Sequence, residues 1–238
     1  MLSFPCLYEI SNKQYQKLLT HNSRNLINFS FRPLAVKPGP KKCLNIVVVG
    51  DGDTGKTSLL MAFRGLPFDR EYVPTVFETY TREMRVEGED VELGMWDTAG
   101  QEGYDRLRPL AYPHCDAFVI CYAVDSPDSL ENVTAKWLPE LEHFCPDVPK
   151  ILVATKKDLR RRTMSIMDLL NSNEPPKIVS YEEGLCKAAS IGAARFLETS
   201  ALQNRGVKEV FTHTARVALN ERKKRKSGNG RKEICRIL

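Results

Sequence analysis

The octapeptide GDGDTGKT, residues Gly50–Thr57, follows the apolar run CLNIVVV and precedes the helix-like run SLLMAF. It fits the pattern G-x-x-x-x-G-K-[ST]. Glycines in such a loop let backbone N–H groups converge on phosphate oxygens, and the N-terminus of the following helix adds a positive dipole. The stretch therefore predicts a phosphate-binding loop in which Lys56 contacts the outer phosphates and the Thr57 hydroxyl binds Mg²⁺. A chance glycine turn is the alternative, and the flanking strand and helix patterns argue against it.

Length and composition limit the chain to a few classes. It has 238 residues, 42% of them apolar and 27% charged, enough for one compact domain with appendages. The longest apolar runs, such as Ala117–Val124, are too short to cross a bilayer, and the N-terminus lacks the basic leader and apolar core of a secretory signal. Seven cysteines without a C-x-x-C pair indicate reduced thiols rather than a disulfide framework. We therefore expect a protein that stays in the cytosol.

The order of patterns along the chain predicts an α/β fold. Strand-like and helix-like runs alternate, which indicates β-α-β units and a six-stranded, mostly parallel sheet with helices on both faces. Together with the phosphate-loop motif, this is the pattern of a P-loop NTPase. A hairpin with its turn at Glu87–Asp90 predicts one antiparallel strand. Later helices are expected near Ser126–Glu142 and Gly206–Glu221.

Composition also divides the chain into three parts. Residues 1–42 show no sustained period and end in RPLAVKPGPKK, which is typical of a disordered, linker-like extension. Residues 43–221 form the predicted nucleotide-binding domain, and residues 222–238 form a basic tail.

A second motif supplies groups for the outer end of a phosphate chain. WDTAGQE, residues Trp96–Glu102, ends the next strand-like run. There, Asp97 can hold a metal through water, Gly100 can offer its N–H to the terminal phosphate, and Gln101 can orient the attacking water. Thr75, between the two loops, is a candidate second hydroxyl ligand and backbone donor; an exposed loop hydroxyl is the alternative. The predicted metal ligands are Thr57, Thr75 and Asp97, and the predicted catalytic residues are Gln101 and Lys56.

The choice of base depends on TKKD, residues Thr155–Asp158, directly after the strand-like run ILVA. The Asp158 carboxylate can accept hydrogen bonds from the ring N–H and the exocyclic amine of guanine. Adenine presents a ring acceptor at the same place, which would leave the carboxylate unpaired. We therefore expect guanine to be preferred over adenine by a factor on the order of 10⁴. Lys156 can lay its stem on the base, the TSA triplet Thr199–Ala201 can offer a backbone N–H, and Phe68 can cover the base edge. Surface lysines and a core phenylalanine are the alternatives. GTP and GDP with Mg²⁺ are thus the predicted cofactors, bound by Gly50, Asp51, Gly52, Asp53, Thr54, Gly55, Lys56, Thr57, Ser58, Phe68, Tyr72, Thr75, Asp97, Thr98, Ala99, Gly100, Gln101, Thr155, Lys156, Asp158, Leu159, Ser200, Ala201 and Leu202.

The order of these motifs between Leu44 and Glu221 resembles the Ras superfamily of small GTPases. Within it, YVPTVFETY, WDTAGQEGYDRLRPLAYP and the segment RRRTMSIMDLLNSNEPPKIV after TKKD are similar to the Rho family, the last segment resembling the Rho-type insert helix. KTSLLMAF and WLPELEHFCPDVP are closest to the Rif/RhoD branch. Two positions depart from the pattern: Thr155 stands where many relatives have Asn, and Leu202 where Lys is common.

The resemblance implies a GTP-hydrolysing switch in actin cytoskeleton and cell-shape signalling. GTP would order the loops around residues 72–80 and 101–108, effectors would bind that surface, and hydrolysis would release it. The implied partners are guanine nucleotide exchange factors, GTPase-activating proteins, a prenyl-binding dissociation inhibitor and Rho effectors; nucleic acid is not among them. The implied effector residues are Tyr72, Val73, Pro74, Thr75, Val76, Phe77, Glu78, Thr79 and Tyr80.

Asp53 stands where the resembled family has a small uncharged residue. A carboxylate about 5 Å from a phosphate charge is repelled by roughly 1 kcal/mol in bulk water and about 3 at an effective dielectric near 20. We therefore expect Asp53 to speed nucleotide exchange and to bias the switch toward GTP. The alternative is a side chain turned to solvent, where salt screens its charge.

The C-terminus carries a predicted membrane anchor. Arg222–Lys226 and Arg231–Lys232 are basic, Cys235 is fourth from the end and Leu238 is last. This pattern favours geranylgeranylation of Cys235 beside a basic stretch that supplies the second anchoring signal, although Arg236 is not aliphatic. We expect a protein at the cytoplasmic face of the cell membrane with a cytosolic pool; a frayed basic tail or a nuclear-targeting run is the alternative.

Two other functions compete with a hydrolysing switch. One is a constitutively GTP-loaded, fast-exchanging signalling module with little hydrolysis, which Asp53 would favour. The other is a P-loop kinase, against which stand the guanine-reading TKKD and the position of Gln101.

Overall fold

The computed structural model describes residues 42–68, 75, 77–161 and 177–227. The N-terminal extension before Lys42, most of the predicted insert helix, Tyr72–Pro74, Val76 and the prenylation motif at Cys235 lie outside the described residues. Expectations for these parts therefore stay predictions.

The sheet has six strands in the order β2-β3-β1-β4-β5-β6. Only the β2–β3 pair is antiparallel, and β1 runs parallel to both β3 and β4. The predicted P-loop NTPase sheet with one antiparallel strand is therefore confirmed. The strands are β1 (Lys42–Val49), β2 (Phe77–Val86), β3 (Glu89–Thr98), β4 (Ala117–Ala123), β5 (Lys150–Thr155) and β6 (Arg195–Glu198).

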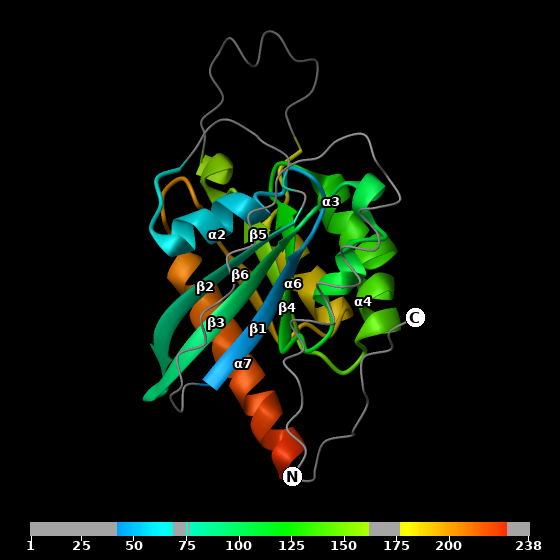
Figure 1. The fold of residues 1–238 in the computed structure, drawn as a ribbon. Coiled ribbons are helices and arrows are strands. Elements are labelled where there is room, and N and C mark those ends of the chain that lie inside the picture. Colours follow the sequence, from blue (N-terminus) through cyan, green and yellow to red (C-terminus); the bar gives the residue numbers. More distant parts are fainter. Residues whose placement is uncertain (1–41, 69–74, 76, 162–176, 228–238) are drawn as a thin grey trace, which may run out of the picture. The chain divides into compact units, whose positions relative to one another are not determined.

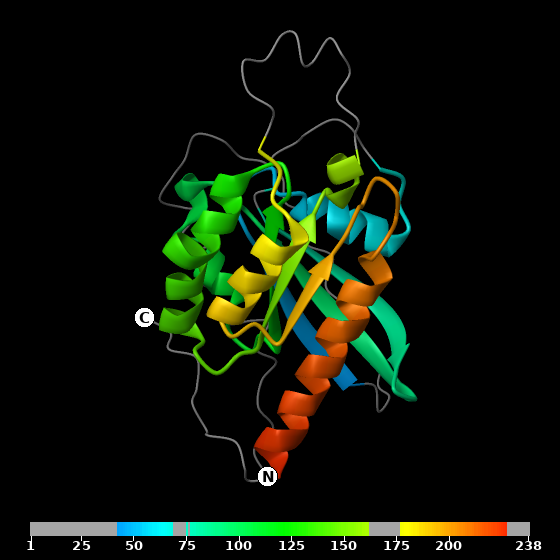
Figure 2. The same ribbon diagram turned by 180° about the vertical axis from the view of Figure 1, so that it is seen from behind.

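Helices cover both faces of this sheet, as Figures 1 and 2 show from opposite sides. Helices α2 and α7 pack on one face in a core with Phe63 and Phe211, whose rings stack at 4.0 Å. Helices α3, α4 and α6 cover the other face, around the fully buried Trp137. The α-helices are α2 (Lys56–Arg64), α3 (Pro127–Asn132), α4 (Leu138–Phe144), α6 (Tyr181–Ser190) and α7 (Val207–Lys226), with short 3₁₀ turns η1 (Glu102–Tyr104), η2 (Arg108–Ala111) and η4 (Lys157–Arg161).

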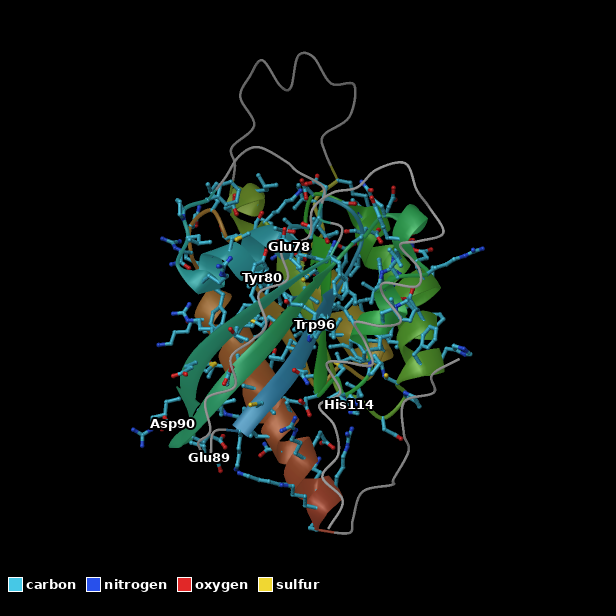
Figure 3. All side chains as sticks on the ribbon, viewed as in Figure 1. Glu78, Tyr80, Glu89, Asp90, Trp96 and His114 are labelled. Atoms are coloured by element: carbon cyan, nitrogen blue, oxygen red, sulfur yellow. The ribbon has the colours of Figure 1, made fainter. Side chains whose placement is uncertain are left out.

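The hairpin is tighter than the sequence indicates. Val86 pairs directly with Glu89, so the turn consists of Glu87 and Gly88 alone, both with positive φ. Such two-residue turns match the right-handed twist of the strands they connect. Figure 3 shows Glu89 and Asp90 at the tip of the hairpin, far from Glu78 and Tyr80 at its other end.

The helix expected near Ser126–Glu142 is interrupted by a π turn. Helix α3 ends at Asn132, the π turn η3 spans Val133–Trp137, and α4 follows directly. Pro139 lacks the backbone N–H that a regular α-helix would use there, and the widened turn lies immediately before it.

The last helix continues past its expected end at Glu221 to Lys226. Arg222 explains the extension, because its Nε and Nη2 bind the two carboxylate oxygens of the buried Asp116 at 2.5 and 2.6 Å. The first basic block of the predicted tail is therefore helical. In the part of the chain that the structure describes, no helix is both long and apolar enough to span a membrane.

Two ends of a long connection also meet. Arg160 Nε donates to the carbonyl of Val179 at 2.7 Å, directly before α6. The segment predicted as the insert helix therefore leaves and rejoins the domain at one point.

Candidate nucleotide and metal site

One cavity of about 490 Å³ lies at the carboxyl ends of the parallel strands, where α/β proteins bind ligands. It brings together the three predicted motifs. The predicted nucleotide-binding residues that line the cavity are Gly52, Asp53, Gly55, Lys56, Thr57, Ser58, Phe68, Thr75, Thr98, Gly100, Gln101, Thr155, Lys156, Asp158, Leu159, Ala201 and Leu202. Six predicted residues do not line the cavity: Gly50, Asp51, Thr54, Asp97, Ala99 and Ser200. Tyr72 lies outside the described residues.

Five lining residues were not predicted to bind nucleotide: Leu59, Met61, Pro67, Thr199 and Glu78, the last of which was predicted as an effector residue. Pro67 and Thr199 neighbour predicted positions. Met61 follows Thr57 by four residues on α2 and therefore lies on the same face of the helix. Helical periodicity was the signal in the sequence that could have identified it.

The phosphate loop closes around the Lys56 ammonium. Lys56 is only 6% exposed, and its Nζ donates to the carbonyls of Gly50 and Asp51 at 2.9 and 2.7 Å. Burial lowers the pKa of Lys56, and the negative charge of Asp97 opposes that shift. Gly50 has a φ of 143°, and a Cβ there would lie 2.2 Å from the carbonyl oxygen of Cys121, so only glycine fits. A buried cation inside a ring of backbone groups suits a phosphate anion.

The predicted metal ligands converge. Thr57 Oγ1 lies 2.7 Å from both Thr75 Oγ1 and Asp97 Oδ2. Asp97 is fully buried, and its Oδ1 has no hydrogen-bond partner among the described residues. Two hydroxyls and one carboxylate fit Mg²⁺, which keeps several waters and binds few protein oxygens. The described residues contain no group of three or more His, Cys, Asp or Glu that could hold a metal ion.

The loop after Asp97 packs tightly against the phosphate loop. A Cβ on Gly100 would lie 2.3 Å from both the carbonyl carbon of Asp51 and the backbone nitrogen of Gly52. The Ala99 carbonyl accepts a 3.1 Å hydrogen bond from the buried Arg108. Gln101 is exposed and lines the cavity.

The base end of the cavity is tied to the phosphate end by Thr155. Its buried Oγ1 lies 2.6 Å from the Thr54 carbonyl and 3.0 Å from that of Tyr122. The Thr155 hydroxyl thus holds the phosphate loop in this chain. Asp158 accepts a 2.5 Å hydrogen bond from Ser200 Oγ, which orients the carboxylate beside the cavity.

Two acidic residues of the phosphate loop point in different directions. Asp51 directs its carboxylate away from the cavity, to Trp137 and Asn132. Asp53 lies on the cavity wall with a φ of 58°, and its carboxylate is 3.2 Å from Lys156 Nζ.

Apart from Thr75, the described residues of the predicted effector segment begin β2. Phe77 is buried against Trp96, at 5.4 Å between ring centres. Glu78 and Thr79 are exposed, and the Tyr80 hydroxyl donates to Glu78 while its ring lies under Arg64. Figure 3 shows Glu78 and Tyr80 at the same end of the hairpin. An exposed strand edge beside the cavity is thus available to a partner.

The fold and this site define a class: P-loop proteins in which a TKKD-type loop and a cluster of two hydroxyls and one carboxylate stand beside the phosphate loop. Comparison with known proteins agrees. The sequence model of the Ras family matches residues 45–220. GTP-binding protein rho1 of Schizosaccharomyces pombe is 50% identical over 196 residues, 81% of this chain and 96% of the relative. Rho-related GTP-binding protein RhoB of Homo sapiens is 50% identical over 193 residues, again 81% and 96% of the two chains.

The chain therefore belongs to the Ras family, as a small GTPase of Rho type that hydrolyses GTP. The cofactors of this family are GTP or GDP with Mg²⁺. Assignment to the Rif/RhoD branch stays a prediction.

The burial of Asp97 predicts a pH-dependent stability for protein stripped of nucleotide and metal. Burial raises the pKa of Asp97 to about 6 from its ordinary 3.8. Its protonation therefore stabilises the fold fully below about pH 4, and that contribution is lost as pH rises through about 6. We expect Asp97→Asn to increase the free energy of unfolding at pH 8 by about 1–3 kcal/mol, with the difference narrowing toward pH 5. Urea titrations of the stripped proteins measure this, and parallel pH profiles for the two would contradict it.

Proposed function

We propose that the chain works as a nucleotide-driven switch through the residues of this cavity. The convergence of Lys56, Thr57, Asp97 and Asp158 on one site is the observation that carries the proposal. GTP would order the effector segment, hydrolysis would release it, and the ordered edge of β2 would recruit Rho effectors.

In the proposed hydrolysis, Gln101 orients the attacking water and Lys56 neutralises charge on the outer phosphates. Bound Mg²⁺ would supply further charge neutralisation from the Thr57, Thr75 and Asp97 side. Among the described residues that line the cavity there is no arginine. We therefore propose that a GTPase-activating protein supplies the missing cation and that hydrolysis without it is slow.

Membership of the Rho-type GTPases favours this hydrolysing switch over a constitutively GTP-loaded module. It also argues against the P-loop kinase, because Asp158 beside Ser200 supports guanine recognition. The proposed regulators are exchange factors, activating proteins and a prenyl-binding dissociation inhibitor, and the proposed pathway is actin and cell-shape signalling.

Base recognition gives the direct test. Asp158→Asn replaces an acceptor by an amide N–H, which suits the 2-carbonyl of xanthine and opposes the 2-amine of guanine. We expect GDP affinity to fall by about 10²-fold or more and the preference to shift toward xanthosine diphosphate. Competition binding with the two nucleotides measures this. An unchanged preference for GDP would show that Asp158 does not read the base.

Asp53 has a partner that the sequence did not reveal. Its carboxylate pairs with Lys156 Nζ, which is also 3.4 Å from Asp125 Oδ2. The Asp53 side chain is 74% exposed, so solvent screens both the pair and any repulsion of phosphate. We therefore propose that Asp53 speeds nucleotide exchange, with a repulsion of the phosphates nearer to the roughly 1 kcal/mol of bulk water than to the value of about 3 at lower dielectric.

The corresponding prediction concerns GDP release. Asp53→Ala should slow the release of a fluorescent GDP by about three- to tenfold at low salt, with a smaller difference at 0.5 M salt. Asp147→Ala removes another exposed acid, beside α4 and away from the cavity, and should release GDP at the wild-type rate. Equal rates for wild type and Asp53→Ala would remove the idea.

The first basic block contributes less charge to membrane binding in this proposal than the sequence indicates, because several of its residues have partners within the domain. Of the first basic block, Arg222 is paired with Asp116, Lys223 lies 3.5 Å from Glu89, and Arg225 donates to a backbone carbonyl. Arg231, Lys232 and the Cys235 lipidation site lie outside the described residues. We propose that geranylgeranylation of Cys235 holds the protein at the cytoplasmic face of the cell membrane, with a cytosolic pool.

This anchor predicts a clear partitioning difference. Protein expressed in cells that carry out prenylation should enter the detergent phase of a Triton X-114 separation, because a C20 chain adds a large apolar surface. Cys235→Ser should stay in the aqueous phase, whereas Cys186→Ser, which changes an exposed thiol on α6, should behave as wild type. Identical aqueous behaviour of all three would contradict the anchor.

A further inference from the structure

A closed ring of contacts joins the phosphate loop to the loop that carries Gly100. It begins at the Asp51 carboxylate, whose oxygens accept 2.7 Å hydrogen bonds from Trp137 Nε1 and Asn132 Nδ2. The guanidinium carbon of Arg108 lies 4.5 Å from the centre of the Trp137 ring, and Arg108 Nε donates to the Ala99 carbonyl. The backbone of Asp51 then meets Gly100 in the close contact that excludes a Cβ.

The far side of this ring is buried and hydrogen-bonded. The side chains of Trp137 and Arg108 are fully buried. Arg108 also donates to Glu140 Oε2 at 2.6 Å and to Asp105 Oδ1 at 2.5 Å, so each nitrogen of the guanidinium has a partner. Charge-assisted hydrogen bonds of a buried guanidinium are strong and costly to break. Arg108 therefore fixes the Ala99 carbonyl against the helical segment, and Asp51 fixes the phosphate loop against the same segment.

Trp137 contacts both residues that hold the two loops, Asp51 and Arg108. It is the last residue of the π turn η3, and its indole ring carries the Asp51 hydrogen bond at its edge and the Arg108 guanidinium on its face. Such π turns inside α-helices are frequent at functional positions. The turn therefore supplies one platform for two loops that approach the same cavity.

We infer that Asp51 is a positioning residue for GTP hydrolysis: by holding Trp137 it sets where Gly100 and Gln101 stand relative to the phosphate loop. The inference depends on the proposed role of Gln101 in orienting water. The Asp51 carboxylate binds Trp137 and Asn132 and is not among the residues that line the cavity, so we infer that it reaches the reaction through the ring. Loss of its carboxylate should therefore affect hydrolysis more than nucleotide retention.

Three substitutions separate these effects in single-turnover hydrolysis of preloaded GTP and in release of fluorescent GDP. Asp51→Ala removes both hydrogen bonds, and Trp137→Phe removes the indole N–H and part of the buried ring system while keeping an aromatic ring at this position. We expect each to slow hydrolysis, Asp51→Ala by about tenfold, with GDP release within about twofold of wild type. Asp51→Asn should recover most of the rate, because its amide oxygen accepts from Trp137 and the Asn132 amide can turn to pair with its nitrogen.

Asp116→Asn is the matched control. Asp116 is also a carboxylate that joins distant segments, since it binds Arg222 and the backbone N–H of Asn45, but it precedes β4 at the opposite end of the sheet. It should lower the urea midpoint without slowing hydrolysis. A purely structural role of Asp51 would give the same result for both positions, and the inference would then fail.

Gln101→Leu in the same assay distinguishes this inference from the proposed function. If Gln101→Leu leaves hydrolysis unchanged, the proposed role of Gln101 is wrong. If Gln101→Leu slows hydrolysis while Asp51→Ala and Trp137→Phe do not, the positioning role of Asp51 is overturned. If Asp51→Ala speeds GDP release as much as it slows hydrolysis, Asp51 acts on nucleotide binding and the inference is likewise overturned.

Discussion

The buried ammonium of Lys56 is the constraint on which the rest of the site depends. Taking a cation out of water costs several kcal/mol unless other groups replace its hydration. Here the phosphate loop wraps around the charge so that two of its own carbonyls accept from Nζ. That wrapping needs the backbone geometry of Gly50 and Gly55, both with positive φ. The negative charge of Asp97 also favours the charged form of Lys56. A phosphate anion would supply the rest of the compensation that two carbonyls give only in part.

Much of the site followed from the sequence because the chemistry sits in short motifs at strand ends. The phosphate loop follows β1, Asp97 lies in β3 and TKKD follows β5, and parallel strands bring their carboxyl ends to one edge of the sheet. Spacing within each motif therefore predicted which residues meet. The mostly parallel sheet followed from the alternation of strand-like and helix-like runs, and the hairpin from its turn; the strand order was not predicted.

What the sequence did not reveal depends on contacts between distant residues. Trp137 lies 86 positions from Asp51, so no local pattern shows which way the Asp51 carboxylate points. The extension of α7 has a similar origin, because a basic run is ordinarily solvated and only the buried Asp116 makes Arg222 part of a packed helix. The π turn was equally hidden, since its apolar spacing is close to that of an α-helix.

Two departures from the family pattern, Thr155 and Asp53, both line the cavity. Thr155 bonds the Thr54 carbonyl, and its neighbour Lys156 pairs with Asp53. Consecutive residues of the base-reading loop thus contact consecutive residues of the phosphate loop. One contact is buried and the other is exposed, so they respond differently to salt. These two contacts join the TKKD loop to the phosphate loop.

The hydrogen bond between Arg160 and Val179 has a consequence for how such a chain diversifies. Because the connection between them begins and ends at one place, lengthening it costs only the slowly growing entropy of loop closure, about 0.6 kcal/mol for each doubling. The geometry of the sheet and of the cavity would not depend on the length of this connection. New recognition surfaces can therefore be grafted at this junction over evolutionary time, while the machinery that handles the nucleotide is inherited intact.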